Sequence, residues 1–193
     1  PMMEKARQSS KAVTFQYRSP YVDKEFFTSY IVRGDRLIST HVDITELKKI
    51  EAALRESEER LRLLGDNLPD SAVYQYAHEP DGSVHFLYFS AGIEKLNGVK
   101  VSDVLSDPGT LHRQIPPEYF DKLIESEARS ARELSDFDME TPMRLPNGQV
   151  KWMRLHSRPR RLPDDRTVWD GVQTDITEFK RAEEILRETE LSL

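Results

Sequence analysis

No cysteine occurs in this chain of 193 residues. Its absence excludes disulfide bonds, zinc–thiolate sites and catalytic thiols, and it is typical of proteins in a reducing compartment. No apolar run approaches the roughly 20 residues needed to cross a bilayer, and no signal peptide is visible. We therefore expect a cytoplasmic location and no membrane contact for these residues.

An excess of positive charge is also lacking, since 28 Lys and Arg are outnumbered by 34 Asp and Glu. The formal net charge is −6 and the pI is near 5.5. Affinity for nucleic acid begins with clustered Lys and Arg side chains that neutralise phosphates. This balance predicts that nucleic acid is not a partner.

Motifs that carry catalysis are missing as well. The sequence has no Gly-rich phosphate loop, no nucleophile elbow and no paired catalytic carboxylates. Its five histidines lack the i, i+4 spacing and the carboxylate pattern of metal sites. We expect no catalytic residues and no metal ligands, which disfavours a small hydrolase or isomerase on an α+β scaffold.

The chain does contain an internal repeat. Residues 43–58 are DITELKKIEAALRESE, and residues 175–190 are DITEFKRAEEILRETE. Each copy follows a β-like run and begins a charged amphipathic helix. A repeated strand-to-helix junction is typical of an array of modules that pass a signal along through helices, and not of a single closed enzyme.

The first 45 residues predict strands and no helix. Aromatic and β-branched residues mark strands at 12–18 and 25–33, and Gly34-Asp35 is a hairpin turn before a return strand at 37–42. We interpret residues 1–45 as the C-terminal, three-strand part of a truncated unit. Without matching helices, this meander is expected to leave hydrophobic surface that needs cover from another chain or from the second unit. The side chains expected there are Phe15, Phe26, Phe27 and Tyr30.

Residues 46–66 predict an amphipathic linker helix. Apolar residues recur at a 3-4-3-4 spacing with one polar position, Ser57, which favours the seam of a two-stranded, parallel coiled coil and hence a homodimer. The alternative is that the stripe packs on its own domain. The seam residues are Leu47, Ile50, Leu54, Leu61 and Leu64.

Residues 67–177 predict one complete α+β unit. Two strands come first, then short helices at 91–97 and 101–105, a break at Pro108-Gly109, a longer helix at 117–134 and three more strands. We expect a five-stranded antiparallel sheet with helices on one face, a pocket between the layers, and an exit helix at 178–193. The strands are expected at 72–78, 84–89, 137–145, 149–158 and 167–174, and the inner face of the long helix at Phe120, Leu123, Ile124 and Ala131.

Two segments resemble the PAS family. The stretch 147–152 (NGQVKW) is similar to its "dG…W" hairpin, and 171–177 (GVQTDIT) is similar to its "G…DIT" terminal strand. The resemblance covers residues 67–177, and the first half-unit ends in the same way. It implies a non-catalytic sensory module beside an output domain of the parent chain, a histidine kinase or a cyclic-dinucleotide enzyme. The alternative is a sensor with an occupied small-molecule or flavin pocket. Since the sequence begins at Pro1, we expect it to be an excised fragment.

The DIT segments are the predicted signal junctions. A threonine at a helix start can cap the helix, and an aspartate can bind backbone N–H groups or a nearby cation. In the resembling family these positions couple the core to the exit helix. The junction residues are Asp43, Thr45, Asp175 and Thr177.

Strand alternation gives the pocket candidates, which are Met139, Thr141, Met143, Met153, Leu155, Trp169 and Gln173. The alternative is that these side chains only fill the core. On the opposite face, Trp152 is a candidate dimer-interface residue.

No cofactor is required by the sequence. Gln173 resembles the glutamine that flavin-binding relatives place against the ring, but their photochemistry needs a cysteine, so only non-covalent flavin or a small metabolite is a candidate. Haem is not expected, because haem-binding relatives carry a histidine on the long helix and residues 117–134 contain none.

Overall fold

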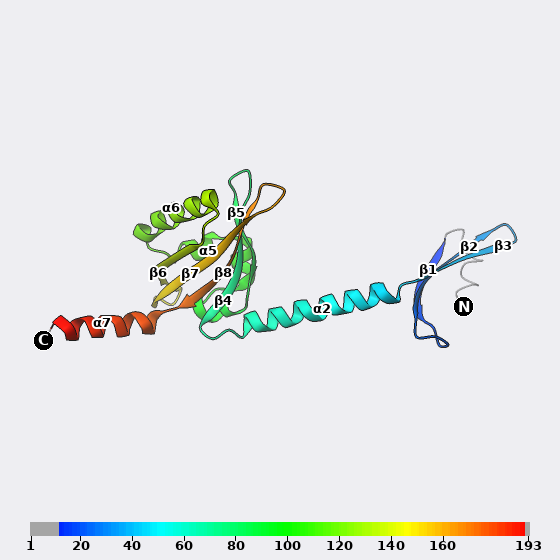
Figure 1. The fold of residues 1–193 in the computed structure, drawn as a ribbon, viewed down its shortest axis with the longest axis horizontal. Helices are drawn as coiled ribbons and strands as arrows, with labels where there is room; N and C mark the ends of the chain where they lie inside the picture. The colour runs from blue at the N-terminus through cyan, green and yellow to red at the C-terminus, as the bar shows by residue number, and fades with distance from the viewer. Residues whose placement is uncertain (1–11, 192–193) are drawn as a thin grey trace. The chain divides into compact units, whose positions relative to one another are not determined.

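The computed structural model describes residues 12–191, with the side chain of Leu191 left out, and the ribbon is drawn in Figure 1. The chain divides into two compact units, residues 1–60 and 61–193. Each unit is described separately. Residues 192–193 of the predicted exit helix and residues 1–11 of the predicted half-unit lie outside the described part of the chain.

The first unit is a three-stranded antiparallel meander. It consists of β1 (Val13–Arg18), β2 (Glu25–Arg33) and β3 (Arg36–Asp43), in the order β1-β2-β3. The three strands were predicted. Gly34 has a φ of +63° at the hairpin turn, where glycine avoids the strain of the left-handed region. Ile44 is the single buried hydrophobic residue among those described in this unit.

Hydrophobic side chains remain exposed on this meander, as the missing helices suggested. Of the four residues named from the sequence, Phe27 is exposed, and Phe15, Phe26 and Tyr30 are half-buried. The rings of Phe15 and Tyr30 lie 5.5 Å apart, and Tyr17 stacks on Phe26 at 5.8 Å. What covers this surface stays a prediction.

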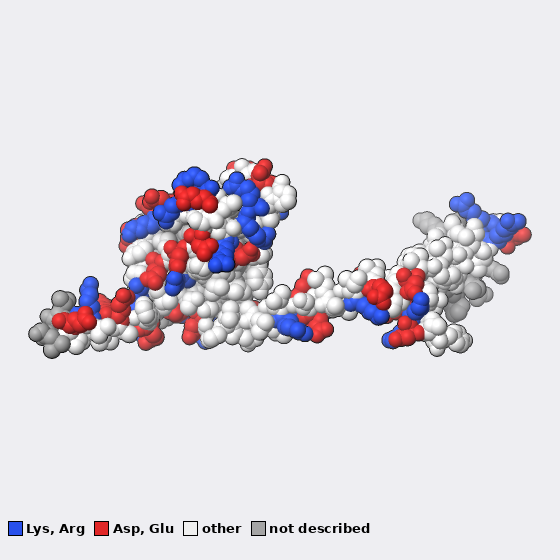
Figure 2. Space-filling view, viewed as in Figure 1, with Lys and Arg blue, Asp and Glu red and all other residues white. Residues whose placement is uncertain are grey.

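Helix α2 (Thr45–Asp66) follows directly. Glu and Lys or Arg side chains pair along it at i, i+3 and i, i+4 spacing, such as Lys49 with Glu46 and Arg60 with Glu56. Figure 2 shows these basic and acidic side chains interspersed along the helix. All five predicted seam residues are exposed, from 54% for Leu47 to 67% for Leu61. In a single chain these seam residues are therefore free to contact a second helix. Their role in a dimer stays a prediction.

The second unit contains a five-stranded antiparallel sheet of order β5-β4-β8-β7-β6. This confirms the predicted α+β architecture. The last strand of the chain, β8, lies at the centre between β4 and β7. The strands are β4 (Ser71–His78), β5 (Val84–Phe89), β6 (Phe137–Arg144), β7 (Val150–Arg161) and β8 (Thr167–Asp175).

The helices between β5 and β6 pack against the sheet and complete the core. Leu123 is 3% exposed on the inner face of the longest one, and Trp169 of β8 is 2% exposed. These helices are α3 (Gly92–Asn97), α4 (Val101–Ser106), α5 (Gly109–His112) and α6 (Pro117–Glu133), and the exit helix is α7 (Thr177–Leu191).

One short helix was missed by the sequence analysis, and one expectation about the long helix was wrong. The predicted break is present, since α4 ends at Ser106 and Asp107 is extended, but α5 begins right after it, because Pro108 adopts a helical backbone and accepts the N–H of Leu111. Ile124 is 48% exposed. The inner face runs through Leu123, Glu127 and Ser130, and a residue next to Leu123 is rotated by about 100° away from it.

Candidate functional site

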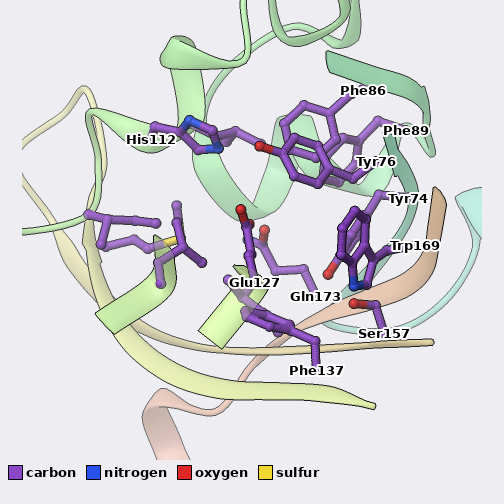
Figure 3. Close-up of a pocket in the computed structure, with 15 residues that line it drawn as sticks. Tyr74, Tyr76, Phe86, Phe89, His112, Glu127, Phe137, Ser157, Trp169 and Gln173 are labelled. Carbon is purple, nitrogen blue, oxygen red and sulfur yellow. The ribbon is translucent and has the colours of Figure 1, made fainter. Parts of the chain in front are cut away.

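A cavity of about 50 Å³ lies between the sheet and helices α5 and α6. Figure 3 shows its lining. Aromatic rings come mainly from β4 and β5, with Phe137 of β6 and Trp169 of β8, and polar side chains come from α5, α6, β7 and β8. The lining residues are Tyr74, Tyr76, Phe86, Phe89, Leu111, His112, Ile115, Leu123, Glu127, Phe137, Met143, Leu155, Ser157, Trp169 and Gln173.

The aromatic part of the wall follows from strand alternation. Tyr74 and Tyr76 are two apart on β4 and so point to the same face. The ring of Tyr76 lies 4.8 Å from that of Phe86, and the ring of Tyr74 lies 5.4 Å from that of Phe89. Burial raises the pKa of both tyrosines far above the ordinary value, so both hydroxyls stay protonated.

A chain of buried amides closes one side of the cavity. Gln173 Nε2 donates to Asn97 Oδ1 at 2.5 Å, and Asn97 Nδ2 donates to Gln114 Oε1 at 2.9 Å. Gln114 Nε2 in turn donates to the Asn97 carbonyl at 3.1 Å. Because buried amides are costly to leave unpaired, this chain fixes Gln173 against α3 and the α5–α6 connection.

Glu127 differs from these amides. It is 9% exposed, and its carboxylate points into the cavity (Figure 3). His78 Nε2 lies 3.4 Å from Glu127 Oε2, within ion-pair distance, yet that buried nitrogen has no hydrogen-bond partner among the described residues.

His112 is a second polar group of the wall. Its ring packs against Tyr76, Phe86 and Phe120. Burial lowers the pKa of His112, and the nearby Glu127 carboxylate only partly opposes this shift. The imidazole is therefore neutral at pH 7.

Four of the seven pocket candidates line the cavity, namely Met143, Leu155, Trp169 and Gln173. The structure places the other three on the same sheet face but outside the lining. Thr141 and Met153 are opposite each other in the β6–β7 register and are fully buried, and Met139 packs against the core.

Eleven of the fifteen lining residues were not among the pocket residues predicted from the sequence. The Tyr-x-Tyr alternation at 74–76 was a usable signal for an inward aromatic face. The spacing of Leu123, Glu127 and Ser130 was another, since residues four and three apart share a helix face. No sequence pattern around His112 indicated that it lines the cavity.

The cavity is too small for a flavin as it stands. Pockets for drug-sized ligands are typically about 300–1,000 Å³. At about 50 Å³ this one holds a few waters, each of which needs roughly 10–15 Å³ of such space. A ring system would require the aromatic wall to move.

The exit junction is held by a compact network of hydrogen bonds. Asp175 Oδ1 accepts the N–H of Thr177 at 3.0 Å and its hydroxyl at 2.6 Å. The Thr177 hydroxyl oxygen accepts the backbone N–H of Trp152 at 3.0 Å, and Lys151 Nζ lies 3.1 Å from Asp175 Oδ2. Three elements, β7, β8 and α7, therefore meet in one network.

The first junction has the same network. Asp43 Oδ1 accepts the N–H and hydroxyl of Thr45 at 3.0 and 2.6 Å, and Thr45 accepts the N–H of Glu25 at 3.0 Å. Lys24 Nζ lies 2.7 Å from Asp43 Oδ2. We call the Asp, Thr, strand N–H and Lys contacts at each site the junction network.

Neither threonine caps its helix, which corrects the sequence expectation. Each lies at the first helical position, and its hydroxyl bonds backward to the strand, while the aspartate accepts the N–H of the threonine. Burial acts to raise the pKa of Asp175, but the bonds from Thr177 and Lys151 outweigh it and hold that pKa below its usual value. Bonds from Lys24 and Thr45 lower the pKa of Asp43 further.

Trp152 is covered by its own exit helix. Lys180 Nζ lies 5.4 Å from the centre of the Trp152 ring and 2.6 Å from Glu140 Oε2. The Tyr119 ring meets the same indole edge-on at 6.0 Å. A role for Trp152 between two chains stays a prediction.

Within residues 12–191, no cluster of three or more His, Asp or Glu side chains could hold a metal ion. None of the helices described there is long and apolar enough to cross a membrane.

A sequence profile described as the PAS fold matches residues 86–173. An RNA-binding light-oxygen-voltage receptor is 12% identical, with a TM-score of 0.50 over 99% of this chain and 84% of that one. The PAS domain of a Colwellia psychrerythraea protein is 15% identical, with a TM-score of 0.49 over 62% and 97%. A sensory box histidine kinase/response regulator from Burkholderia thailandensis E264 is 16% identical, with a TM-score of 0.47 over 62% and 88%. No curated protein matches the chain in sequence.

Proposed function

We propose that this chain, of which residues 86–173 match a sequence profile of the PAS fold, is a non-catalytic sensory and regulatory module of a multidomain signalling protein. It passes its signal through the two junction networks and the helices that follow them. The output we expect is a histidine kinase or a cyclic-dinucleotide enzyme in the parent chain, and the working form is a homodimer through α2.

The observation that carries this proposal is the repeated junction network. The same four contacts occur at both strand-to-helix junctions, with matching bond lengths of 3.0, 2.6 and 3.0 Å. A strand N–H that donates to the threonine hydroxyl is not a general feature of helix N-termini, so its presence at both junctions favours a shared role. A network that ties two strands to the first residue of a helix couples a shift of either strand to that helix.

Removal of the Thr177 hydroxyl tests whether the exit junction network passes the signal to α7. Thr177→Val keeps the side-chain shape but leaves the Trp152 N–H without its acceptor. We expect it to uncouple the domain from a histidine kinase or diguanylate cyclase catalytic domain joined after α7, so that output no longer responds to the input. Thr189→Val is the matched control, because its hydroxyl bonds only the Ile185 carbonyl within α7.

The readouts are output activity and near-UV circular dichroism of the buried Trp169. A Thr177→Val protein that keeps its dichroism and still regulates normally would reject the relay. Loss of regulation in the Thr189→Val control would also reject it, because the effect would then belong to α7 in general.

A second function, sensing of a small molecule, is favoured by the cavity. Glu127 and His112 are polar groups on its wall, and His78 Nε2, 3.4 Å from the Glu127 carboxylate, is a buried nitrogen with no hydrogen-bond partner among the described residues. A ligand can supply that partner. Native mass spectrometry and absorbance of the purified chain test this, and an empty cavity in every preparation would favour the purely regulatory module.

A further inference from the structure

We infer that the cavity binds a compact alkylammonium cation, with Glu127 as its counter-ion and the surrounding rings as its cage. This inference rests on the proposed ligand-sensing function and names the chemical class of the ligand. It follows from the charge, the rings and the size of one site.

The charge comes from a single residue. Glu127 is the one carboxylate among the lining residues, and the wall contains no Lys or Arg. His112 does not neutralise it, since burial lowers the pKa of that imidazole. A carboxylate out of water is unfavourable unless it is paired with a cation or accepts hydrogen bonds. An ammonium group in the cavity supplies both.

The rings add a second, independent preference for a cation. Figure 3 shows the Glu127 carboxylate pointing into a space bounded by Tyr76, Tyr74 and Phe137. The faces of aromatic rings carry negative electrostatic potential, and they attract cations most strongly where water is excluded. An anion would meet both the carboxylate and these faces, so the site rejects anions for the same two reasons.

The size limits the cation. The cavity volume of about 50 Å³ is a third of the roughly 150 Å³ engineered cavity that accepts benzene. A methylammonium or trimethylammonium ion is the kind of ligand that enters with small ring movements. A long polyamine or a flavin is excluded without rebuilding the wall.

His78 is the competing partner for Glu127. Its Nε2 is 3.4 Å from the carboxylate, but it makes no hydrogen bond there, and its ring packs at 4.6 Å on Trp169. The nitrogen therefore borders the site without closing it. A wild-type chain whose carboxylate is already satisfied by His78 would bind no cation, which the titration below detects.

The experiment titrates the full 193-residue chain with trimethylammonium chloride and follows Trp169 fluorescence and calorimetric heat. Sodium chloride controls for ionic strength, and tert-butanol is an uncharged molecule of similar shape. We expect saturable binding of the cation, with affinity for tert-butanol at least about tenfold weaker, the scale of a desolvated cation–π contact.

Glu127→Gln is the matched test of the charge, because it keeps the shape of the side chain. It should weaken trimethylammonium binding by at least about tenfold and leave tert-butanol unchanged. Glu125→Gln makes the same charge change on the exposed side of α6 and should have no effect. Phe86→Leu removes one ring of the cage and should weaken cation binding by a smaller factor.

Equal affinity for the cation and tert-butanol, no saturation, or an unchanged Kd in Glu127→Gln would each overturn the cation inference. Native mass spectrometry separates this failure from failure of the sensing function. A different bound molecule would keep the sensor and reject the cation. An empty chain that binds neither probe would reject both.

Discussion

At the scale of single residues, three carboxylates carry the functional proposals for this chain. Asp43 and Asp175 occupy equivalent places and each organises a strand-to-helix junction. Glu127 carries the same carboxylate group in a different environment. The junction carboxylates accept N–H and hydroxyl hydrogen bonds and pair with a lysine, whereas Glu127 lies among aromatic rings with His78 Nε2 at 3.4 Å.

Removal of the Asp175 carboxylate should destabilise the second unit in a pH-dependent way. Asp175→Ala loses charge-assisted bonds from Thr177 and Lys151, and we expect a loss of about 1–3 kcal/mol at pH 7. The folded-state pKa lies below the unfolded value, so this contribution is present above about pH 4 and is lost as pH falls through the folded pKa.

Urea denaturation at pH 7 and at low pH measures the difference between wild type and variant. The two curves should converge on acidification. Asp121→Ala, at an exposed position of α6, is the control and should match wild type at both pH values. A gap between wild type and Asp175→Ala that persists or widens in acid would contradict the assigned pKa direction.

At the scale of elements, the sequence was sufficient for the strands. All eight follow from β-branched and aromatic runs bounded by Gly, Pro and Asn turns, and β5 agrees with its predicted bounds to the residue. Helix α5 was not predicted from the sequence, because a Pro-Gly pair normally ends a helix or strand. In the structure Pro108 has a helical backbone and precedes the first residue of α5. The cavity wall from β4 was not predicted, although the two tyrosines at 74 and 76 share one face, because that pattern was not compared with the polar residue between them.

Gly171 on β8 should tolerate no side chain. A Cβ there would lie 2.5 Å from Tyr74 Cζ and 2.6 Å from Ser157 Cβ, closer than atoms pack. Both neighbours are buried and cannot move freely. We expect Gly171→Ala to lower the free energy of unfolding by about 1–3 kcal/mol, the usual range for overpacking.

Thermal unfolding followed by Trp fluorescence measures this effect. Gly148→Ala provides the comparison, since Gly148 has a φ of +86° with open space around its Cβ position. That variant should lose only about 1 kcal/mol from backbone strain. A Gly171→Ala protein as stable as wild type would show that the sheet relaxes around the contact.

The exposed leucines of α2 should matter for association and not for folding. Leu54→Ala with Leu61→Ala removes two seam side chains that are 58% and 67% exposed in the single chain. If they pack in a parallel dimer, each contributes about 2–5 kcal/mol to it. We expect a shift from dimer to monomer in sedimentation velocity, with an unchanged unfolding transition of the second unit.

Leu63→Ala is the matched control, since Leu63 is also exposed on α2 but lies off the seam. It should leave the sedimentation coefficient unchanged. A double variant that remains dimeric, or a wild-type chain that is monomeric at micromolar concentration, would remove the coiled-coil interpretation.

At the scale of the whole molecule, nearly all of the folding energy resides in one unit. Every buried hydrophobic residue of the described chain except Ile44 lies within residues 61–193. Burial of apolar surface is the main favourable term in folding. The first unit, by contrast, has three strands with little to bury.

Separate fragments should therefore behave differently. We expect residues 61–193 to unfold cooperatively, with both tryptophans reporting the same transition. We expect residues 1–60 alone to show no cooperative transition, because a small meander without a covered hydrophobic face is marginal in water. Circular dichroism and heteronuclear NMR measure both, and a well-dispersed spectrum for 1–60 alone would show that its face is covered from within.

The central position of β8 has a consequence for synthesis on the ribosome. The first strand of the sheet, β4, pairs with the last, β8, and about 90 residues of chain separate them. At about 5–20 residues per second, the nascent chain spends roughly 5–20 s with β4 made and its central neighbour not yet translated. During that interval β4 is paired only with β5, and a chain stopped before Thr167 contains two separate hairpins, β4–β5 and β6–β7, with no strand between them.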